Sequence, residues 1–297
     1  MTFVYYIFRL FALLIRIVPF RLIYMLSDFF YFLLYYVFRY RRSTVKTNLK
    51  NSFPKKTERE LLQIEKDFYH HLCDVFFESV KMIYMPEKQI RKHCRFANRE
   101  ILDVYFQQGK SVIGISAHYG NWEWGLLSLS LHAPHRTLGI YKPLSAVRFE
   151  KIMRGVRGKF GMVLVPMKTT LKAILEHKNE LSLTTFIADQ TPLLDETVYW
   201  TNFMNQDTAV FTGPEKIARK MDFPMILFTI KKRKRGYYEV VISPINDSPK
   251  ETSGTMLTEK YIRMMEQQIN EEPEYWLWSH RRWKHKRVLT PASAQEQ

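Results

Sequence analysis

The sequence predicts an α/β protein in which a mostly parallel sheet is flanked by helices and preceded by a hydrophobic, helical N-terminal segment. Beyond residue 86, short β-rich runs alternate with helical stretches, a pattern typical of parallel sheets with helices on their faces. Before residue 43, apolar and aromatic residues dominate. The 297 residues are 46% hydrophobic and 25% charged, which excludes a disordered, collagenous or wholly membrane-embedded chain.

Residues 1–42 are expected to anchor the chain on a membrane. The longest uncharged run, Phe29 to Phe38, is shorter than the roughly 18 residues that mark a spanning helix. Arg9 and Arg16 are seven apart, so on a helix they share a face and can reach headgroups while the aromatic rings insert. We therefore expect a monotopic anchor. A buried helical hairpin kinked at Pro19 and a tilted span are the alternatives.

Residues 1–42 are not typical of a secretory signal, because charged residues lie within the apolar stretch and no small-residue cleavage site follows it. We expect the chain to stay on the cytoplasmic side. We expect two parts, the anchor (1–42) and one α/β domain (43–297), because no repeat or low-complexity linker divides the latter. Cys73 and Cys94 are expected to be buried, reduced thiols.

Periodicity places the elements along the chain. A helical period runs from Thr57 to Tyr84 and ends before Pro86. The expected strands are Ser111–Ala117, Arg136–Tyr141, Gly161–Val165, Leu181–Ala188 and Pro224–Ile230, with an edge hairpin made by Phe228–Lys232 and Tyr237–Ile242. The expected helices between them are Glu100–Gln108, Asn121–Leu131, Ala146–Lys159, Lys168–His177 and Gly213–Met221.

The segment Ser111 to Gly125 carries the clearest chemical signal. A β-run delivers His118 at its C-terminal end, Gly120 permits a tight turn, Asn121 can cap a helix, and Glu123 falls in its first turn. Ligands of α/β sheets bind at that edge. A carboxylate that holds one imidazole nitrogen leaves the other free to take a proton from a hydroxyl. This spacing predicts a general base that activates an alcohol; a hydrogen-bonded loop histidine is the alternative.

The motif HYGNWE resembles the His-x4-Asp/Glu motif of membrane-associated acyltransferases, and in particular the lipid A lauroyl/myristoyl (late) acyltransferase family. Further segments agree: Tyr141-Lys142-Pro143, Asp189-Gln190, Phe203 to Ala218 and Pro273 to Lys284. The resemblance implies the fold of glycerol-phosphate acyltransferases. Glycerol-phosphate acyltransferases usually carry Asp where Glu123 stands, which favours the lipid A branch.

The resemblance also implies a reaction. His118 would deprotonate a hydroxyl of the acceptor and Glu123 would orient His118, with an acyl carrier protein thioester as donor and neither cofactor nor metal. The acceptor would be lipid A or its precursor, at the cytoplasmic face of the bacterial inner membrane. Substrate-binding roles are expected for Asn121, Lys142, Asp189, Gln190 and Arg281. For Asp189, capping of the following turn is an equal alternative.

Two departures bear on the acceptor. Lys142 stands where the family commonly has Arg, which replaces a bidentate grip with a point charge. Phe203-Met204-Asn205 replaces a usual Phe-Phe-Gly. An aminolipid or lysophospholipid is therefore the alternative acceptor.

The net charge of +16, from 45 Lys and Arg against 29 Asp and Glu, indicates an anionic partner. The cluster 231–235 is expected at a hairpin tip that faces lipid phosphates or the acidic carrier protein, or as a solvated turn. The cluster 281–287 interleaves with tryptophans, which suits a membrane interface. A noncatalytic membrane-binding or nucleic-acid-binding protein is the rival class, but the aromatic anchor argues against nucleic acid.

Overall fold

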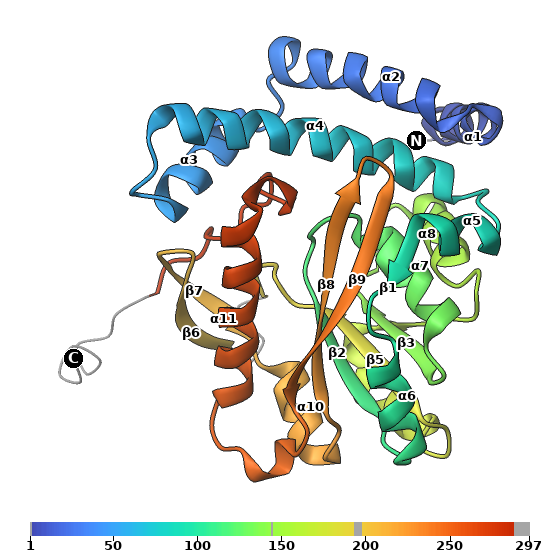
Figure 1. Cartoon of the computed structure of the whole chain (residues 1–297), viewed down its shortest axis with the longest axis vertical. Coiled ribbons are helices and arrows are strands. Elements are labelled where there is room, and N and C mark those ends of the chain that lie inside the picture. The colour runs from blue at the N-terminus through green and yellow to red at the C-terminus, as the bar shows by residue number, and fades with distance from the viewer. Residues whose placement is uncertain (1, 144, 193–197, 288–297) are drawn as a thin grey trace.

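A computed structural model describes residues 2–143, 145–192 and 198–287 (Figure 1). Its central seven-stranded sheet has the order β1-β9-β8-β2-β5-β3-β4, and β6 and β7 form a separate two-stranded sheet. The strands are β1 (Cys94–Phe96), β2 (Val112–Ser116), β3 (Arg136–Tyr141), β4 (Val163–Pro166), β5 (Ser182–Ile187), β6 (Val198–Phe203), β7 (Gln206–Phe211), β8 (Met225–Lys234) and β9 (Tyr237–Asn246).

Neighbouring strands of the large sheet are parallel except β8 and β9, which form an antiparallel hairpin. This confirms the predicted mostly parallel sheet and the hairpin, although the hairpin lies inside the sheet and β1 forms the edge. The β6–β7 hairpin was not predicted. Its turn places Met204 and Asn205 at φ 53° and 60°, so the departure from Phe-Phe-Gly falls on left-handed turn positions.

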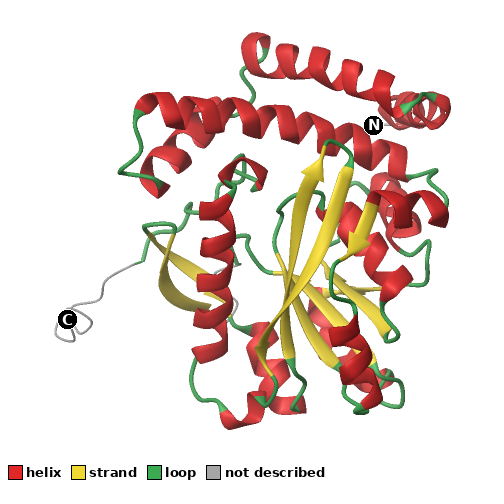
Figure 2. Cartoon of the chain, in the orientation of Figure 1, coloured by secondary structure: helices red, strands yellow, loops and turns green. Residues whose placement is uncertain are grey.

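Helices cover the two faces of the sheet (Figure 2). The helices beyond the N-terminal segment, of which α3 and α4 lie across one end of the sheet in Figure 1, are α3 (Arg42–Ser52), α4 (Glu58–Met82), α5 (Glu87–His93), α6 (Glu100–Gln107), α7 (Trp122–His132), α8 (Val147–Arg157), α9 (Thr170–Glu176), α10 (Gly213–Met221) and α11 (Met256–Glu271). The predicted helices are thus present, whereas α3, α5 and α11 were not anticipated. A capping box of Thr57 and Glu60 starts α4.

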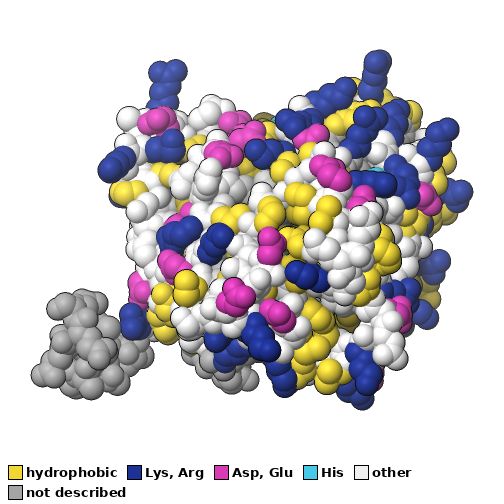
Figure 3. Space-filling view, turned by 60° about the horizontal axis from the view of Figure 1, so that its bottom comes forward, with side chains coloured by type: hydrophobic (Ala, Val, Ile, Leu, Met, Phe, Trp, Pro, Cys, Tyr) yellow, Lys and Arg dark blue, Asp and Glu magenta, His cyan; other side chains and the backbone are white. Residues whose placement is uncertain are grey.

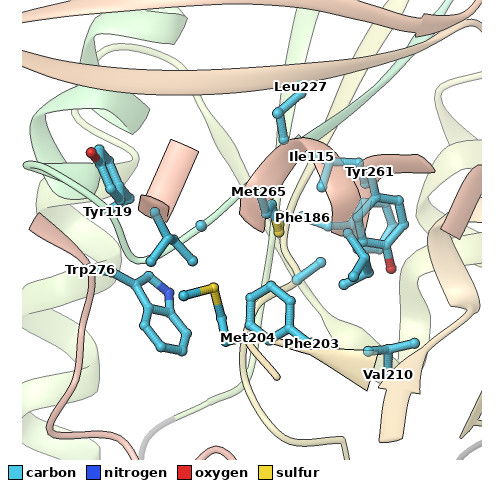
Figure 4. Packing of buried hydrophobic residues seen from close by; sticks show 14 of the residues in the cluster. Ile115, Tyr119, Phe186, Phe203, Met204, Val210, Leu227, Tyr261, Met265 and Trp276 are labelled. Carbon is cyan, nitrogen blue, oxygen red and sulfur yellow. The ribbon is translucent and has the colours of Figure 1, made fainter. Parts of the chain in front are cut away.

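Side-chain alternation along β2 and β8 sorts the core into two layers. Ile113, Ile115 and Leu227 pack with Tyr261 and Met265 of α11 (Figure 4). Their sequence neighbours face the opposite side and pack under α7: Val112, Ile226 and Phe228. Cys73 and Cys94 are buried and form no disulfide, as expected.

The N-terminal segment forms α1 (Thr2–Ile17) and α2 (Phe20–Phe32), continued by a π-helical turn over Leu33–Val37. The break falls at Pro19, where the hairpin alternative placed its kink. The buried Lys81 of α4 fixes this elbow, because its Nζ donates to the carbonyls of Ile15, Arg16 and Val18 at 2.7–3.0 Å. In Figure 1, α2 runs alongside α4 across one end of the sheet.

Most large apolar side chains of this segment face outward. Exposed ones include Phe3, Leu10 and Ile17 of α1 and Met25 and Phe29 of α2. The window Phe20–Val37 is long and apolar enough to cross a membrane, yet only 17% of it is buried in the protein. A buried helical hairpin would hide these side chains, so this alternative does not fit.

Candidate active site

The turn between β2 and α7 carries the predicted base. Gly120 adopts φ 59°, and a Cβ there would lie 2.3 Å from the carbonyl oxygen of Ile230, so this position requires glycine. The Oδ1 of Asn121 accepts a hydrogen bond from the backbone N–H of Trp124 at 3.0 Å and caps α7, as predicted. His118 therefore leaves the carboxyl end of β2 just before a rigid turn.

Strand register brings a buried carboxylate to His118. Ser116 pairs with Ile187 in the parallel β2–β5 ladder, and His118 and Asp189 each lie two residues farther along. Nδ1 of His118 lies 2.7 Å from Oδ1 of Asp189, and the backbone N–H of His118 donates to Oδ2 at 3.0 Å. Asp189 thus orients the imidazole directly.

This contact determines which ring nitrogen is basic. A carboxylate can only accept, so Nδ1 of His118 carries the hydrogen and Nε2 keeps its lone pair. Nε2 lies 3.3 Å from the side-chain amide nitrogen of Gln190, which is exposed. The His118 side chain is 19% exposed. A substrate hydroxyl that replaced the Gln190 amide could donate its hydrogen to Nε2 of His118.

Asp189 stays ionised despite its burial. Burial alone would raise its pKa, but the charge of His118 and hydrogen bonds from His118 and Trp276 hold the pKa of Asp189 below its ordinary value. Trp276 supplies its indole N–H at 2.9 Å. The site therefore pairs an imidazole with a permanent negative charge, an arrangement that stabilises imidazolium when a proton is taken up.

Residues 275–277 complete the turn. The backbone N–H of Leu277 donates to the carbonyl of His118, and that of Gly120 donates to the carbonyl of Tyr275, at 3.1 and 3.0 Å. Trp276 and Trp278 are at most 2% exposed. The interpretation of these two tryptophans as membrane-interface residues is therefore wrong, because both are buried in the core.

Glu123 has a different partner from the one predicted. Its carboxylate, in the first turn of α7, receives two hydrogen bonds from Arg157 at the end of α8, at 2.9 and 2.5 Å. Burial would lower the pKa of Arg157, but Glu123 outweighs that effect and the pKa lies above its usual value. The expectation that Glu123 orients His118 is thus corrected, since Asp189 does so and Glu123 forms a buried ion pair.

The predicted role of Asn121 in substrate binding is also corrected. Its side chain is fully buried, with Oδ1 capping α7 and Nδ2 donating to Glu78 at 2.7 Å. Both ends of the amide are engaged within the protein. This geometry gives Asn121 a structural role in the turn in place of the predicted substrate-binding role.

An apolar cavity lies beside the base. It lies between α7 and the sheet, is partly open to solvent, and in this structure has room for about one water molecule. Trp122 lines it and also contacts the His118 ring edge-on, with ring centroids 5.2 Å apart. The other lining residues are Phe96, Ser116, Gly125, Leu126, Leu129, Thr185, Phe228, Ile230 and Val240. A hydrocarbon chain would find an apolar environment within reach of the base.

Comparison with known sequences identifies the family. The model of a family described as bacterial lipid A biosynthesis acyltransferase matches residues 1–285. The chain belongs to this family. It is therefore an enzyme that transfers acyl groups, which confirms the resemblance stated from the sequence.

Individual relatives of this lipid A biosynthesis acyltransferase family member are distant. A lipid A biosynthesis acyltransferase of Haemophilus influenzae is 22% identical over 273 residues, covering 90% of this chain and 83% of the relative. A lipid A biosynthesis lauroyltransferase of Escherichia coli is 20% identical over 245 residues, covering 82% of this chain and 79% of the relative.

The remaining predicted site residues of the acyltransferase, Lys142 and Arg281, are exposed. Lys142 is exposed just beyond β3, at the same edge of the sheet as His118. Arg281 is exposed, and its backbone carbonyl accepts from Thr191. Its neighbour Arg282 is buried and donates to Thr208 and to the carbonyl of Ala209.

Basic residues 231–235 form mostly internal contacts. Lys232 and Arg235 pair with the buried Asp74, and Arg233 pairs with Glu239. Lys232 and Arg235 thus tie α2 and α4 to the hairpin. Arg233 and Lys234 are exposed near its tip, so the lipid- or carrier-facing tip stays a prediction. On the face shown in Figure 3, basic side chains are dispersed with acidic ones among them. Within the described residues, no group of three or more His, Cys, Asp or Glu could hold a metal ion.

Sequence reasoning missed Arg157 and Trp276 as site residues. Arg157 ends an amphipathic helix, where a basic residue has an ordinary explanation in the helix dipole. Trp276 belongs to the segment Pro273 to Lys284, which carries the family resemblance. That resemblance was the one feature of the sequence that could have pointed to Trp276.

Proposed function

We propose that this enzyme transfers a fatty acyl chain from an acyl carrier protein thioester to a hydroxyl of lipid A or its precursor, with His118 as general base. The observation that carries the proposal is the basic Nε2 of His118, held at the carboxyl edge of the sheet by the ionised Asp189. The names of the relatives support the lipid A acceptor.

The chemistry needs no covalent enzyme intermediate. Nε2 of His118 takes the hydroxyl proton as the acceptor oxygen attacks the thioester carbonyl, and Asp189 stabilises the resulting imidazolium. Collapse of the tetrahedral intermediate breaks the C–S bond, and the leaving thiolate recovers the proton from His118. The cavity beside Trp122 would hold the acyl chain during transfer.

The other predicted residues take secondary roles in this proposal. Glu123 acts through Arg157, whose guanidinium it fixes near the edge where oxyanion charge develops. Gln190 holds the imidazole until the acceptor hydroxyl displaces its amide. Lys142 and Arg281, both exposed, meet phosphates of the acceptor or of the carrier protein.

The N-terminal helices would lie on the cytoplasmic face of the bacterial inner membrane without crossing it. Tyr24, Ser27 and Asp28 of α2 hydrogen bond to α4 and the β8–β9 hairpin. A spanning α2 would draw these polar partners into the hydrocarbon, which is costly. An in-plane helix keeps them at the headgroup level and inserts only its outer face.

The test is mass spectrometry of lipid A and total lipids from cells that carry wild-type enzyme or His118→Ala. Loss of one acyl chain from lipid A in the variant is the expected result. Loss from an aminolipid or phospholipid instead would move the acceptor to the alternative class. The matched control is His177→Ala, since His177 pairs with Glu180 before the start of β5, at the opposite edge of the sheet. Unchanged lipids with a folded, membrane-bound His118→Ala enzyme would overturn the proposal.

A further inference from the structure

One face of α4 presents three buried polar side chains toward the active-site turn and the anchor. They are His71, Asp74 and Glu78, each at most 4% exposed. Their spacing of three and four residues puts them on one side of the helix. The reaction proposed above uses none of them, and each is costly to bury unless its hydrogen bonds are satisfied.

Glu78 joins three separate elements through neutral donors. Its carboxylate accepts hydrogen bonds from the hydroxyl of Tyr24 on α2 at 2.9 Å, from the amide of Asn121 at 2.7 Å and from the hydroxyl of Tyr238 on β9 at 2.7 Å. Among the ion pairs of the described residues, none includes Glu78. Burial, with a further effect of Asp74, raises the pKa of Glu78 to about 7.

The turn that follows His118 depends on α4 at two points. Nδ2 of Asn121 donates to Glu78 while its Oδ1 caps α7. Burial and the charge of Lys232 lower the pKa of His71 to about 3, so its ring is neutral. Nδ1 of His71 accepts from Lys232, and its Nε2–H therefore donates to the carbonyl of Gly120. Helix α4 thus holds consecutive residues of the turn.

The same face of α4 holds the anchor helix. Ser27 of α2 donates to Asp74 at 2.8 Å, and Tyr24 donates to Glu78. Between these inward polar groups, Met25 and Leu26 point outward and are exposed. Although Ile23 is also buried, the exposed apolar side chains of α2 differ from the polar outer face expected of a helix on a soluble protein. An apolar surrounding on the outer side of α2 accounts for this difference.

We propose that Glu78 is a positioning residue that couples the seating of α2 on a lipid surface to the order of the turn carrying His118. Seating of α2 fixes the Tyr24 hydroxyl against Glu78, and Glu78 in turn fixes Asn121 and the first turn of α7. The enzyme would then be most active when α2 rests on a membrane. This inference depends on the proposed transferase activity for its kinetic test, and on the geometry alone for its structural test.

The kinetic test compares two tyrosine variants that each remove one hydroxyl from Glu78. Tyr24→Phe cuts the link to α2, whereas Tyr238→Phe cuts a link within the sheet. On vesicles of phosphatidylethanolamine and phosphatidylglycerol, Tyr24→Phe is expected to lower kcat about tenfold with KM for the thioester donor unchanged. The rate enhancement that vesicles give over detergent should vanish in Tyr24→Phe and persist in Tyr238→Phe.

The structural test is hydrogen exchange of backbone amides 119–125, read by mass spectrometry on the full chain. Vesicles should slow this exchange in the wild-type enzyme and in Tyr238→Phe, but not in Tyr24→Phe, while all three bind vesicles equally in cosedimentation. Equal vesicle protection in Tyr24→Phe and wild type would overturn the inference. So would exchange that rises throughout the chain, because it indicates a general loss of stability.

Failure of the proposed function gives a different result. In that case the wild-type enzyme transfers no acyl chain under any condition, while the vesicle-dependent protection of residues 119–125 still supports the coupling.

Discussion

His118 and Asp189 occupy equivalent places on adjacent parallel strands, each two residues beyond the paired residues Ser116 and Ile187. Strand register therefore brings the two side chains close, and the turn after His118 and the Trp276 indole N–H complete the 2.7 Å contact. Any sequence that keeps β2 beside β5 and preserves both spacings will bring the two side chains together. This relationship makes Asp189 the group that orients the His118 imidazole.

Asp189→Asn should lower kcat by about 10²- to 10⁴-fold, because the neutral amide cannot stabilise imidazolium and its NH2 group cannot accept the N–H donors that each carboxylate oxygen meets. Steady-state transfer with purified enzyme, together with thermal unfolding to check the fold, measures this. Glu123→Gln should cost less activity. A larger loss of kcat in Glu123→Gln than in Asp189→Asn would indicate that Glu123 is the carboxylate that assists His118.

The Glu123–Arg157 pair should show strong coupling in stability. Removing one partner, as in Glu123→Gln or Arg157→Met, leaves a buried charge or polar group and should cost about 3–5 kcal/mol of unfolding free energy. The double variant should lose less than the sum of the two single variants, since neither charge remains. Urea unfolding of the wild type, the two single variants and the double variant gives the double-mutant cycle. Strict additivity would mean that the ion pair contributes nothing specific.

The cavity beside Trp122 should determine the length of the acyl chain. Leu129→Ala enlarges it and should shift preference toward longer donors, whereas Leu126→Phe narrows it and should favour shorter ones. Competition between carrier-protein thioesters of different chain length gives the ratio of kcat/KM values. An unchanged ratio in both variants would place the acyl chain elsewhere.

The outer face of α2 should carry membrane binding. Met25 and Phe29 are 65% and 62% exposed, and burying such side chains in lipid contributes about 1.5–3 kcal/mol each. Met25→Asp with Phe29→Asp should therefore abolish cosedimentation with vesicles and leave thermal unfolding unchanged. Leu175→Asp, at an exposed leucine of α9, is the control and should bind as wild type does. Retained binding of the double variant would exclude this face.

The raised pKa of Glu78 predicts a pH dependence of stability. Because its folded pKa of about 7 exceeds the ordinary value of 4.5, its favourable contribution is complete below pH 4.5 and is lost as pH rises through about 7. The wild-type enzyme should therefore lose stability relative to Glu78→Gln across that window. The lowered pKa of His71 acts in the opposite direction in both proteins and cancels in the difference. A flat difference in unfolding free energy would contradict the prediction.

The sequence could predict each strand that ends in a functional residue but not the order of the strands. His118 and Asp189 were both recognised at strand ends, yet their pairing requires β2 beside β5, which periodicity does not specify. Because Glu123 is five residues from His118 in the sequence, it was predicted to orient the imidazole, but in the structure Asp189 makes that contact. The partner of Glu123, Arg157, is 34 residues away on another helix, so only packing could reveal it.

The composition of the C-terminal segment led to a second wrong prediction. Trp276, Trp278 and neighbouring basic residues have the composition of a membrane interface, yet both tryptophans are buried in the core. The strand β6 carries a signal in its sequence, the β-branched and aromatic residues of Val198–Phe203, although the hairpin was not predicted.

The backbone clamp between residues 118–120 and 275–277 has a consequence for biosynthesis. The anchor helices leave the ribosome first and the turn with His118 follows, but its clamp and the Trp276 donor to Asp189 emerge only near the end of translation. The nascent chain can thus reach lipid before its base is assembled. If His118 is the base, as we propose, a chain that ends before Tyr275 should be inactive, because it lacks both the backbone clamp on the His118 turn and the Trp276 donor to Asp189.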